Sequence, residues 1–183
     1  MNIIDSLRKH AMTLGFTGTG EIDPSAITLE EGFRKACESN VCRSYGANWQ
    51  CPPALPPLAE IEQTLKKYSK AVLVQTVIYL EDSFDFEGLT AGAENHKKSM
   101  EKIAAFVRKA YAECSPLILG AGACRICKEC AYLRKEPCLF PKRAIPSVEG
   151  YGMNAGAITT AAGLKYNNGE ATVSYVGLIL LQL

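Results

Sequence analysis

The chain has 183 residues, 48% of them apolar and 21% charged, which is the composition of a globular domain with a substantial core. The formal net charge is only +1 and no stretch gathers five or six like charges, so the sequence argues against a nucleic-acid-binding surface. The apolar run at residues 176–181 is far shorter than the roughly 20 residues that cross a bilayer. We expect one domain over residues 1–183 that binds neither nucleic acid nor membrane.

Eight cysteines are the most unusual feature of the composition. Residues 1–16 include the polar side chains Asp5, Arg8 and Lys9, so they lack the apolar core of a secretory signal, and we expect a cytoplasmic protein. Disulfides are rare in the cytosol, and a chain of this length does not need them to fold. Metal binding is therefore the leading explanation for the cysteines.

The first predicted elements are two helices. Residues 3–14 have the apolar spacing of an amphipathic helix, which a stretch containing glycine then ends. Thr28 and Glu31 form a predicted capping box at the start of a second helix that runs to about residue 39. This second helix would deliver Cys37 at its C-terminal end.

An irregular loop with four prolines is predicted next, over residues 41–57, followed by a helix at residues 58–68. Residues 71–80 are apolar and rich in β-branched side chains on both faces, which is typical of a central strand covered on both sides. Helical spacing returns in a long helix over about residues 93–113.

The C-terminal part is predicted to contain a strand at residues 116–119, a cysteine loop at 120–143, a helix near 148–163 and a last strand at 171–181. Together the elements predict an α/β or α+β fold: a single sheet of three or four strands with helices packed on it and two cysteine-rich metal-binding loops.

Four cysteines stand in the pattern C-x2-C-x2-C-x7-C and resemble the ferredoxin type of cluster loop: Cys124, Cys127, Cys130 and Cys138. At this spacing a turning loop can point successive thiolates inward around one cube of iron and sulfide. Structural zinc usually takes two C-x2-C knuckles separated by a longer spacer, so zinc is the alternative metal and iron–sulfur is favoured.

Positive charge is concentrated around these four cysteines. Residues 124–143 carry six basic and two acidic side chains, a net charge of +4, so the rest of the chain carries −3. A positive environment suits a thiolate-bound cluster of negative charge. A solvated basic loop would have the same composition.

A second group, Cys37, Cys42 and Cys51, has the spacings x4 and x8. Trp49 and the pair Pro52-Pro53 would enclose a metal in a stiff, partly aromatic pocket that limits access of water. Three ordinary buried cysteines are the alternative. If the group binds its own cluster, one iron remains open to a ligand or substrate, although cysteines could also be exchanged between the two loops.

Other titratable residues are given no metal-binding role. Cys114 is predicted to be a core thiol, and His10 and His96 are expected on the surfaces of helices. Ser147 and Glu149 are interpreted as N-capping residues, with a ligand or proton-donating role for Glu149 as the alternative.

Three segments together resemble a known family: C-x4-C-x2-YG-x2-W-x-CPP from Cys37, GACRICKECAYLRKEPCLFP from Gly122, and SVEGYG from Ser147. The family is that of predicted cysteine-rich metal-binding proteins of unknown function from anaerobic bacteria and archaea. All seven clustered cysteines match its pattern. The resemblance implies a metal cofactor and a cytoplasmic location but no particular reaction.

The favoured hypothesis is an iron–sulfur protein, with one or two 4Fe–4S clusters, that has a redox or metal-dependent accessory role and works with a redox partner protein. The first alternative is a structural zinc-binding module. The second is an iron–sulfur enzyme that acts on a small substrate at the open iron, so the sequence leaves enzymatic activity undecided. The oligomeric state is also left open.

Overall fold

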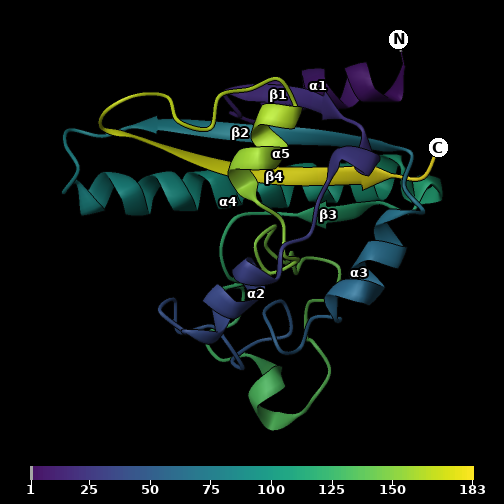
Figure 1. Ribbon diagram of the computed structural model, residues 1–183, viewed down its shortest axis with the longest axis vertical. Helices are drawn as coiled ribbons and strands as arrows, with labels where there is room; N and C mark the ends of the chain where they lie inside the picture. The colour runs from purple at the N-terminus through teal and green to yellow at the C-terminus, as the bar shows by residue number, and fades with distance from the viewer. Residues whose placement is uncertain (1) are drawn as a thin grey trace.

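The computed structural model describes residues 2–183 and contains one antiparallel sheet of four strands (Figure 1). The strand order is β1-β2-β4-β3. The strands are β1 (Gly18–Ile22), β2 (Lys70–Tyr79), β3 (Leu117–Leu119) and β4 (Thr172–Leu181). Together with the five α-helices found in residues 2–183, this sheet makes the fold α+β, in agreement with the fold class predicted from the sequence.

The centre of the sheet is the pairing of β2 with β4, which runs over ten residues from Lys70 opposite Leu181 to Tyr79 opposite Thr172. Most side chains of these two strands are buried, and they alternate between two separate apolar clusters, one on each face of the sheet. Burial on both faces explains why neither strand shows the apolar-polar alternation of a half-exposed strand.

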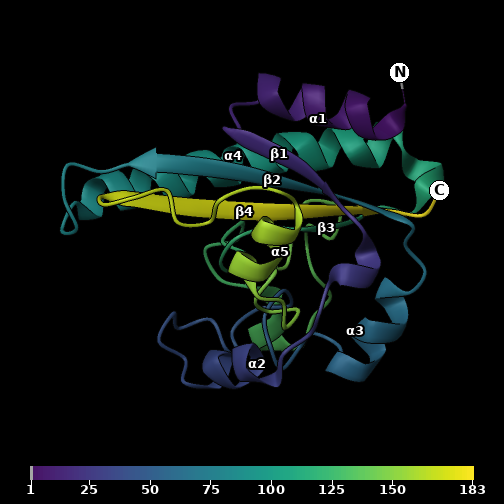
Figure 2. The same ribbon diagram turned by 45° about the horizontal axis from the view of Figure 1, so that its top comes forward.

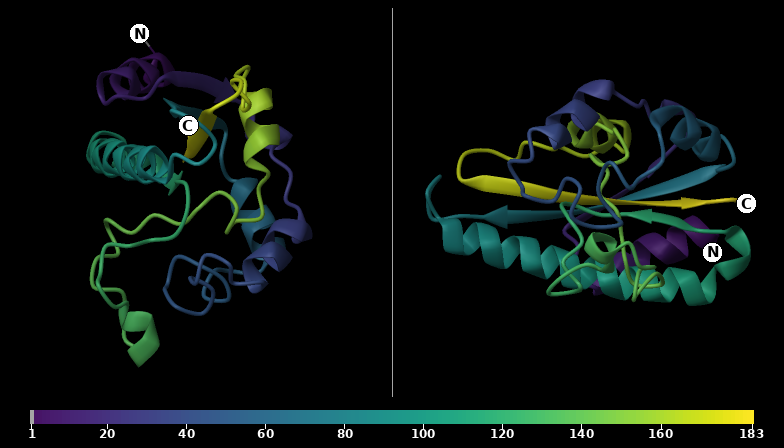
Figure 3. Two further views of the ribbon diagram at one scale, coloured as in Figure 1. Left: turned by 90° about the vertical axis from the view of Figure 1, so that its left-hand side faces the viewer. Right: turned by 90° about the horizontal axis from the view of Figure 1, so that it is seen from below.

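Helices α1 (Ile3–Thr13) and α4 (Phe86–Ala110) cover one face of the sheet (Figure 3). Their buried residues lie on one side of each helix, because apolar side chains recur every three or four positions. In this layer Leu7, Ile103 and Val107 are fully buried against the strands.

The opposite face packs against α3 (Leu58–Leu65) and α5 (Ala155–Ala161), as Figure 2 shows. Helix α2 (Glu31–Glu38) has no buried residue. Both cysteine loops lie beyond the β3 edge of the sheet, on the side away from β1 (Figure 1). The sheet therefore forms a base that leaves the seven clustered cysteines outside the main core.

Strand β1 was not predicted, because its sequence GTGEI contains two glycines and a charged residue. It forms through backbone pairing with β2, from Gly18 opposite Gln75 to Ile22 opposite Ala71. Only Gly20 and Ile22 of this strand are buried, so its apolar signal is weak.

Three predicted helix starts were wrong. Thr28 is not an N-cap: α2 begins after Glu30, whose side chain makes no capping hydrogen bond. Helix α4 begins earlier than predicted, because the Asp85 carboxylate accepts a hydrogen bond from the Gly88 N–H at 2.7 Å. Ser147 and Glu149 lie at a turn, not at the start of a helix. The Ser147 hydroxyl caps this turn by accepting from the Gly150 N–H at 3.0 Å, whereas α5 begins later and is capped by Asn154, whose side chain accepts from the Ala157 N–H at 3.1 Å.

His96 is buried, which contradicts the predicted surface position. It shares one side of α4 with Gly92, Met100 and Ile103, and this side faces the sheet. Its Nδ1 lies 2.9 Å from Thr76 Oγ1. Burial lowers the pKa of the imidazole from its ordinary value of 6.5 to about 4. His96 is therefore neutral in the folded protein at neutral pH.

We expect this histidine to make the metal-free protein less stable in acid. Because the unfolded chain takes up a proton near pH 6.5 and the folded chain only near pH 4, stability falls as the pH drops between these values. The total loss should be about 3 kcal/mol. Urea unfolding at several pH values checks this for the wild type and His96→Gln. An equally steep loss in the variant would contradict the assignment.

No helix among residues 2–183 is both long and apolar enough to cross a membrane.

Candidate metal centre

The four-cysteine loop, residues 120–146, is attached to the sheet directly after β3. The Gly120 N–H donates to the Pro146 carbonyl at 2.8 Å, and the Val148 N–H donates to the Gly120 carbonyl at 3.0 Å. These two bonds close the loop at its base. The interior of the loop has little regular structure, with one 3-10 turn (Ala131–Arg134).

All four cysteines of this loop, each half-buried, line one small cavity of about 20 Å³. They are Cys124, Cys127, Cys130 and Cys138. Asn48, Trp49 and Gln50 of the other cysteine loop form part of its wall. The structure therefore brings together the four residues that the C-x2-C-x2-C-x7-C spacing singled out.

The three-cysteine loop, residues 37–53, is held close to the turn at residues 147–152. Arg34 of α2 donates to the carbonyls of Gly150 at 2.9 Å and of Pro56 at 3.2 Å. Within the loop, the Gly46 N–H donates to the Pro52 carbonyl at 2.8 Å, with Gly46 at a φ of 64°. These contacts fix the ends of the loop but leave Cys42 exposed, while Cys37 is half-buried and Cys51 is buried.

Trp49 joins the two cysteine loops. Its indole Nε1 donates to the Glu136 carbonyl at 2.9 Å, and its ring meets the Tyr132 ring edge-on, with 5.0 Å between centroids. The tryptophan thus belongs to the three-cysteine loop but is bound to the four-cysteine loop. The sequence suggested that Trp49 encloses a metal of the three-cysteine group, whereas the structure places it on the wall of the four-cysteine cavity.

The thiols of the two loops are near enough to affect one another's ionisation. Burial raises the pKa of the Cys51 and Cys124 thiols, and the charge of Cys124 raises that of Cys51 further. Burial likewise raises the pKa of Cys37, with Cys42 adding to the effect. Because metals bind thiolates, uptake of a metal by these residues would release protons.

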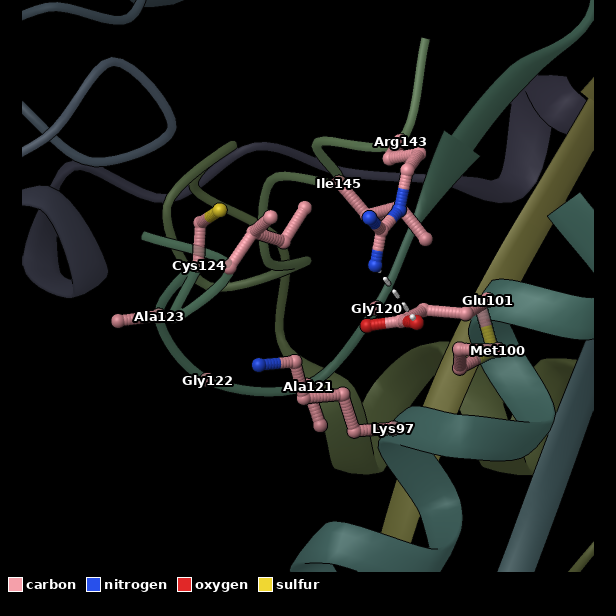
Figure 4. A pocket seen from close by; sticks show the side chains of 11 residues that line it. Lys97, Met100, Glu101, Gly120, Ala121, Gly122, Ala123, Cys124, Arg143 and Ile145 are labelled. Carbon is pink, nitrogen blue, oxygen red and sulfur yellow. Dashed lines mark ion pairs between the residues drawn. The ribbon is translucent and has the colours of Figure 1, made fainter. Parts of the chain in front are cut away.

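Lys97 of α4 supplies a positive charge beside the four-cysteine loop (Figure 4). Its side chain reaches toward the turn at Gly122, and it lowers the pKa of the Cys124 thiol, against the larger raising effect of burial. Sequence reasoning missed this residue, because α4 and the loop are far apart along the chain.

Glu149 lies near Cys37 rather than at the start of a helix. Burial raises the pKa of its carboxyl, and the charge of Glu149 in turn raises the pKa of Cys37. Among residues 2–183 it forms no ion pair. Together with Tyr166 and Gly122 it lines a cavity of about 300 Å³. None of the seven clustered cysteines lines this cavity, so a role of Glu149 as a ligand or proton donor stays a prediction.

All eight cysteines are free thiols, and Cys114 is buried in the core between the sheet and α4, as predicted. In residues 2–183 no three His, Cys, Asp or Glu side chains are close enough together to hold a single metal ion. The four-cysteine cavity has room for about one water molecule. Its four thiols are the donor set of an iron–sulfur cluster.

Comparison with known proteins identifies one family. A family model described as "Predicted metal-binding protein (DUF2284)" matches residues 20–181. No curated protein matches the chain.

Two solved structures are similar at low sequence identity. One is epoxyqueuosine reductase from Streptococcus thermophilus, with a TM-score of 0.45 and 10% identity over 100% of this chain and 46% of that one. The other is a selenomethionine-labelled epoxyqueuosine reductase, with a TM-score of 0.46 and 9% identity over 97% of this chain and 45% of that one. The chain thus spans less than half the length of either reductase.

Proposed function

Since the chain belongs to the DUF2284 family of predicted metal-binding proteins, we propose that it is an iron–sulfur protein with a redox or metal-dependent accessory role. The observation that carries the proposal is the single cavity lined by Cys124, Cys127, Cys130 and Cys138. A 4Fe–4S cluster held by these thiolates would supply one-electron redox chemistry. The protein's own part is to position the thiolates, surround them with positive charge and limit access of water.

Iron–sulfur is favoured over zinc by the arrangement of the thiols. Four thiolates that tightly surround one zinc ion would form a compact tetrahedron, whereas a cluster spreads its thiolates over separate iron atoms. Three of the four cysteines follow one another at x2 spacing in a loop without α-helix or strand. Trp49 and Phe140 cover parts of the same cavity with aromatic surface, which would restrict solvent near a cluster.

The decisive experiment is purification without oxygen, followed by analysis of iron, sulfide and zinc and by EPR of the reduced protein. We expect about four iron and four sulfide per occupied cluster. Stoichiometric zinc in protein that lacks iron would end the proposal. It would instead support the structural zinc module, in which the metal only orders the loops.

The three-cysteine loop is proposed to hold a second cluster with one iron open to a small ligand. Cys42 is exposed, and Glu149 lies close enough to Cys37 for its charge to add to the raised pKa of that thiol, so solvent access and a carboxyl group would be available beside the thiols. The open position is where an enzymatic activity would arise.

We expect the variant Cys42→Ser to distinguish the iron bound by the three-cysteine loop from the iron bound by the four-cysteine loop. The variant should lose about half of the iron, while the EPR signal of the four-cysteine loop persists, because Cys42 does not line that cavity. Iron analysis and EPR on the same sample provide the check. Full iron content in the variant would show that the three cysteines do not hold a cluster.

Lys97 is expected to set the reduction potential of the four-cysteine centre. A nearby positive charge stabilises the more negative, reduced form, so Lys97→Gln should shift the potential to lower values. A redox titration monitored by EPR measures the shift. Lys165→Gln, an exposed position outside the loops, is the matched control and should leave the potential unchanged.

A further inference from the structure

We propose that a basic groove beside the four-cysteine loop is the docking surface for a small acidic electron-carrier protein. This inference rests on the proposed redox function and specifies its partner. The groove has a volume of about 360 Å³ and lies between α4 and the end of the loop. Five of its lining residues are basic and only one is acidic: Lys98, Lys102, Arg108, Lys142, Arg143 and Glu101.

The three lysines of the groove carry the unbalanced charge. Lys98, Lys102 and Lys142 are exposed, and none forms an ion pair in the part of the chain that the structure describes. The two arginines are already engaged. Arg143 pairs with Glu101 at 3.5 Å, and Arg108 donates to backbone carbonyls at the end of the loop. The lysines are therefore available to an acidic partner.

The groove lies next to a proposed cluster ligand. Glu101 and Arg143 also line a smaller pocket whose wall includes Lys97 and Cys124 (Figure 4). A protein docked over the lysines would thus be close to the four-cysteine centre. Electron transfer between two proteins requires a short distance between their redox centres. The interfaces of such complexes are usually small and short-lived.

Exposed apolar side chains complete the surface. Leu139 and Phe140 follow Cys138 directly and are 58% and 40% exposed. The Arg143 guanidinium lies over the Phe140 ring, 5.5 Å from its centroid, which joins the apolar residues to the basic ones. Apolar residues beside a charged rim are typical of a protein-binding surface.

These features favour a protein over a compact anion or a nucleic acid. Arg143 is paired with Glu101 and Arg108 is bonded to backbone carbonyls, so neither arginine of the groove is free to hold a phosphate. Lysines spread over an open surface with adjacent apolar residues are better matched by the acidic face of a protein, because long-range attraction then steers the encounter.

The test measures binding of an acidic 2Fe–2S ferredoxin to the iron-loaded protein by isothermal titration calorimetry, at an ionic strength of about 0.05 M. The triple variant Lys98→Glu, Lys102→Glu, Lys142→Glu should bind at least about tenfold more weakly. The matched control reverses three exposed lysines away from the groove: Lys66, Lys67 and Lys165. It should bind like the wild type.

Unchanged binding by the groove variant, or equal weakening in the control, would overturn the docking surface. So would tight binding of a short single-stranded RNA with the same dependence on the groove lysines. Iron is measured in every sample, so failure of the proposed iron–sulfur function can be distinguished from failure of the proposed docking surface. Absence of iron in the wild type defeats the proposed function, whereas lysine-independent binding by iron-loaded protein defeats only the docking surface.

Discussion

Replacement of Cys127 by serine is expected to remove the iron and sulfide of the four-cysteine loop, about four iron atoms per chain, together with the associated EPR signal. Cys127 lines the shared cavity, and a serine hydroxyl is a much poorer ligand for an iron–sulfur cluster than a thiolate. The metal content of protein purified without oxygen, compared with that of the wild type, measures the effect.

Cys114→Ala is the matched control, because it also removes a thiol. Cys114 is buried in the core and does not line the four-cysteine cavity. This variant should be somewhat less stable but should retain its iron. If both variants lost iron equally, general destabilisation would be the cause. If neither lost iron, the four-cysteine loop would not be the site.

Gly20→Ala should produce the largest loss of stability from a single added methyl group. A Cβ on Gly20 would lie 2.0 Å from the carbonyl oxygen of Ala162 and 2.9 Å from its Cβ. The clash involves the backbone just after α5, so it cannot be relieved by turning a side chain. We expect a loss of about 3 kcal/mol in the free energy of unfolding, measured with urea on the metal-free protein.

The corresponding control is Gly32→Ala, an exposed glycine within α2 whose added Cβ would meet nothing within 4 Å. Alanine favours helix over glycine, so this variant should be as stable as the wild type or more stable by up to about 1 kcal/mol. A similar loss in both variants would contradict the steric explanation.

The central strands were predictable, whereas the edge strand was not. Strands β2 and β4 carry long apolar runs, because both faces of the sheet are covered, and such runs are visible without a structure. Strand β1 depends on pairing with β2, and its Gly20 is needed for the close approach of Ala162. That requirement comes from the tertiary structure and leaves no periodic signal in the sequence.

His96 was misjudged because its immediate neighbours in the chain are polar. Helical spacing gives a better guide: Gly92, His96, Met100 and Ile103 lie on the buried side of α4. The sequence contained this signal, since Met100 and Ile103 are apolar and follow His96 at helical spacing.

The candidate site was predictable to the extent that it depends on local spacing. The C-x2-C-x2-C run led directly to the shared cavity. The contributions of Lys97 and of the groove lysines could not be predicted in this way, because they depend on how α4 lies against a distant loop. Glu149 was interpreted as an N-capping residue for the same reason. Its proximity to Cys37 arises only in the folded chain and could not be predicted from local spacing.

The indole of Trp49 makes the two thiol groups mechanically dependent on each other. If the four-cysteine loop is displaced, it carries the Glu136 carbonyl with it, so either this hydrogen bond breaks or the segment around Cys51 follows. If each loop holds a metal centre, binding of metal at one centre would then change the metal affinity of the other. Because such coupling is reciprocal, the two proposed centres should change each other's metal affinity by the same factor.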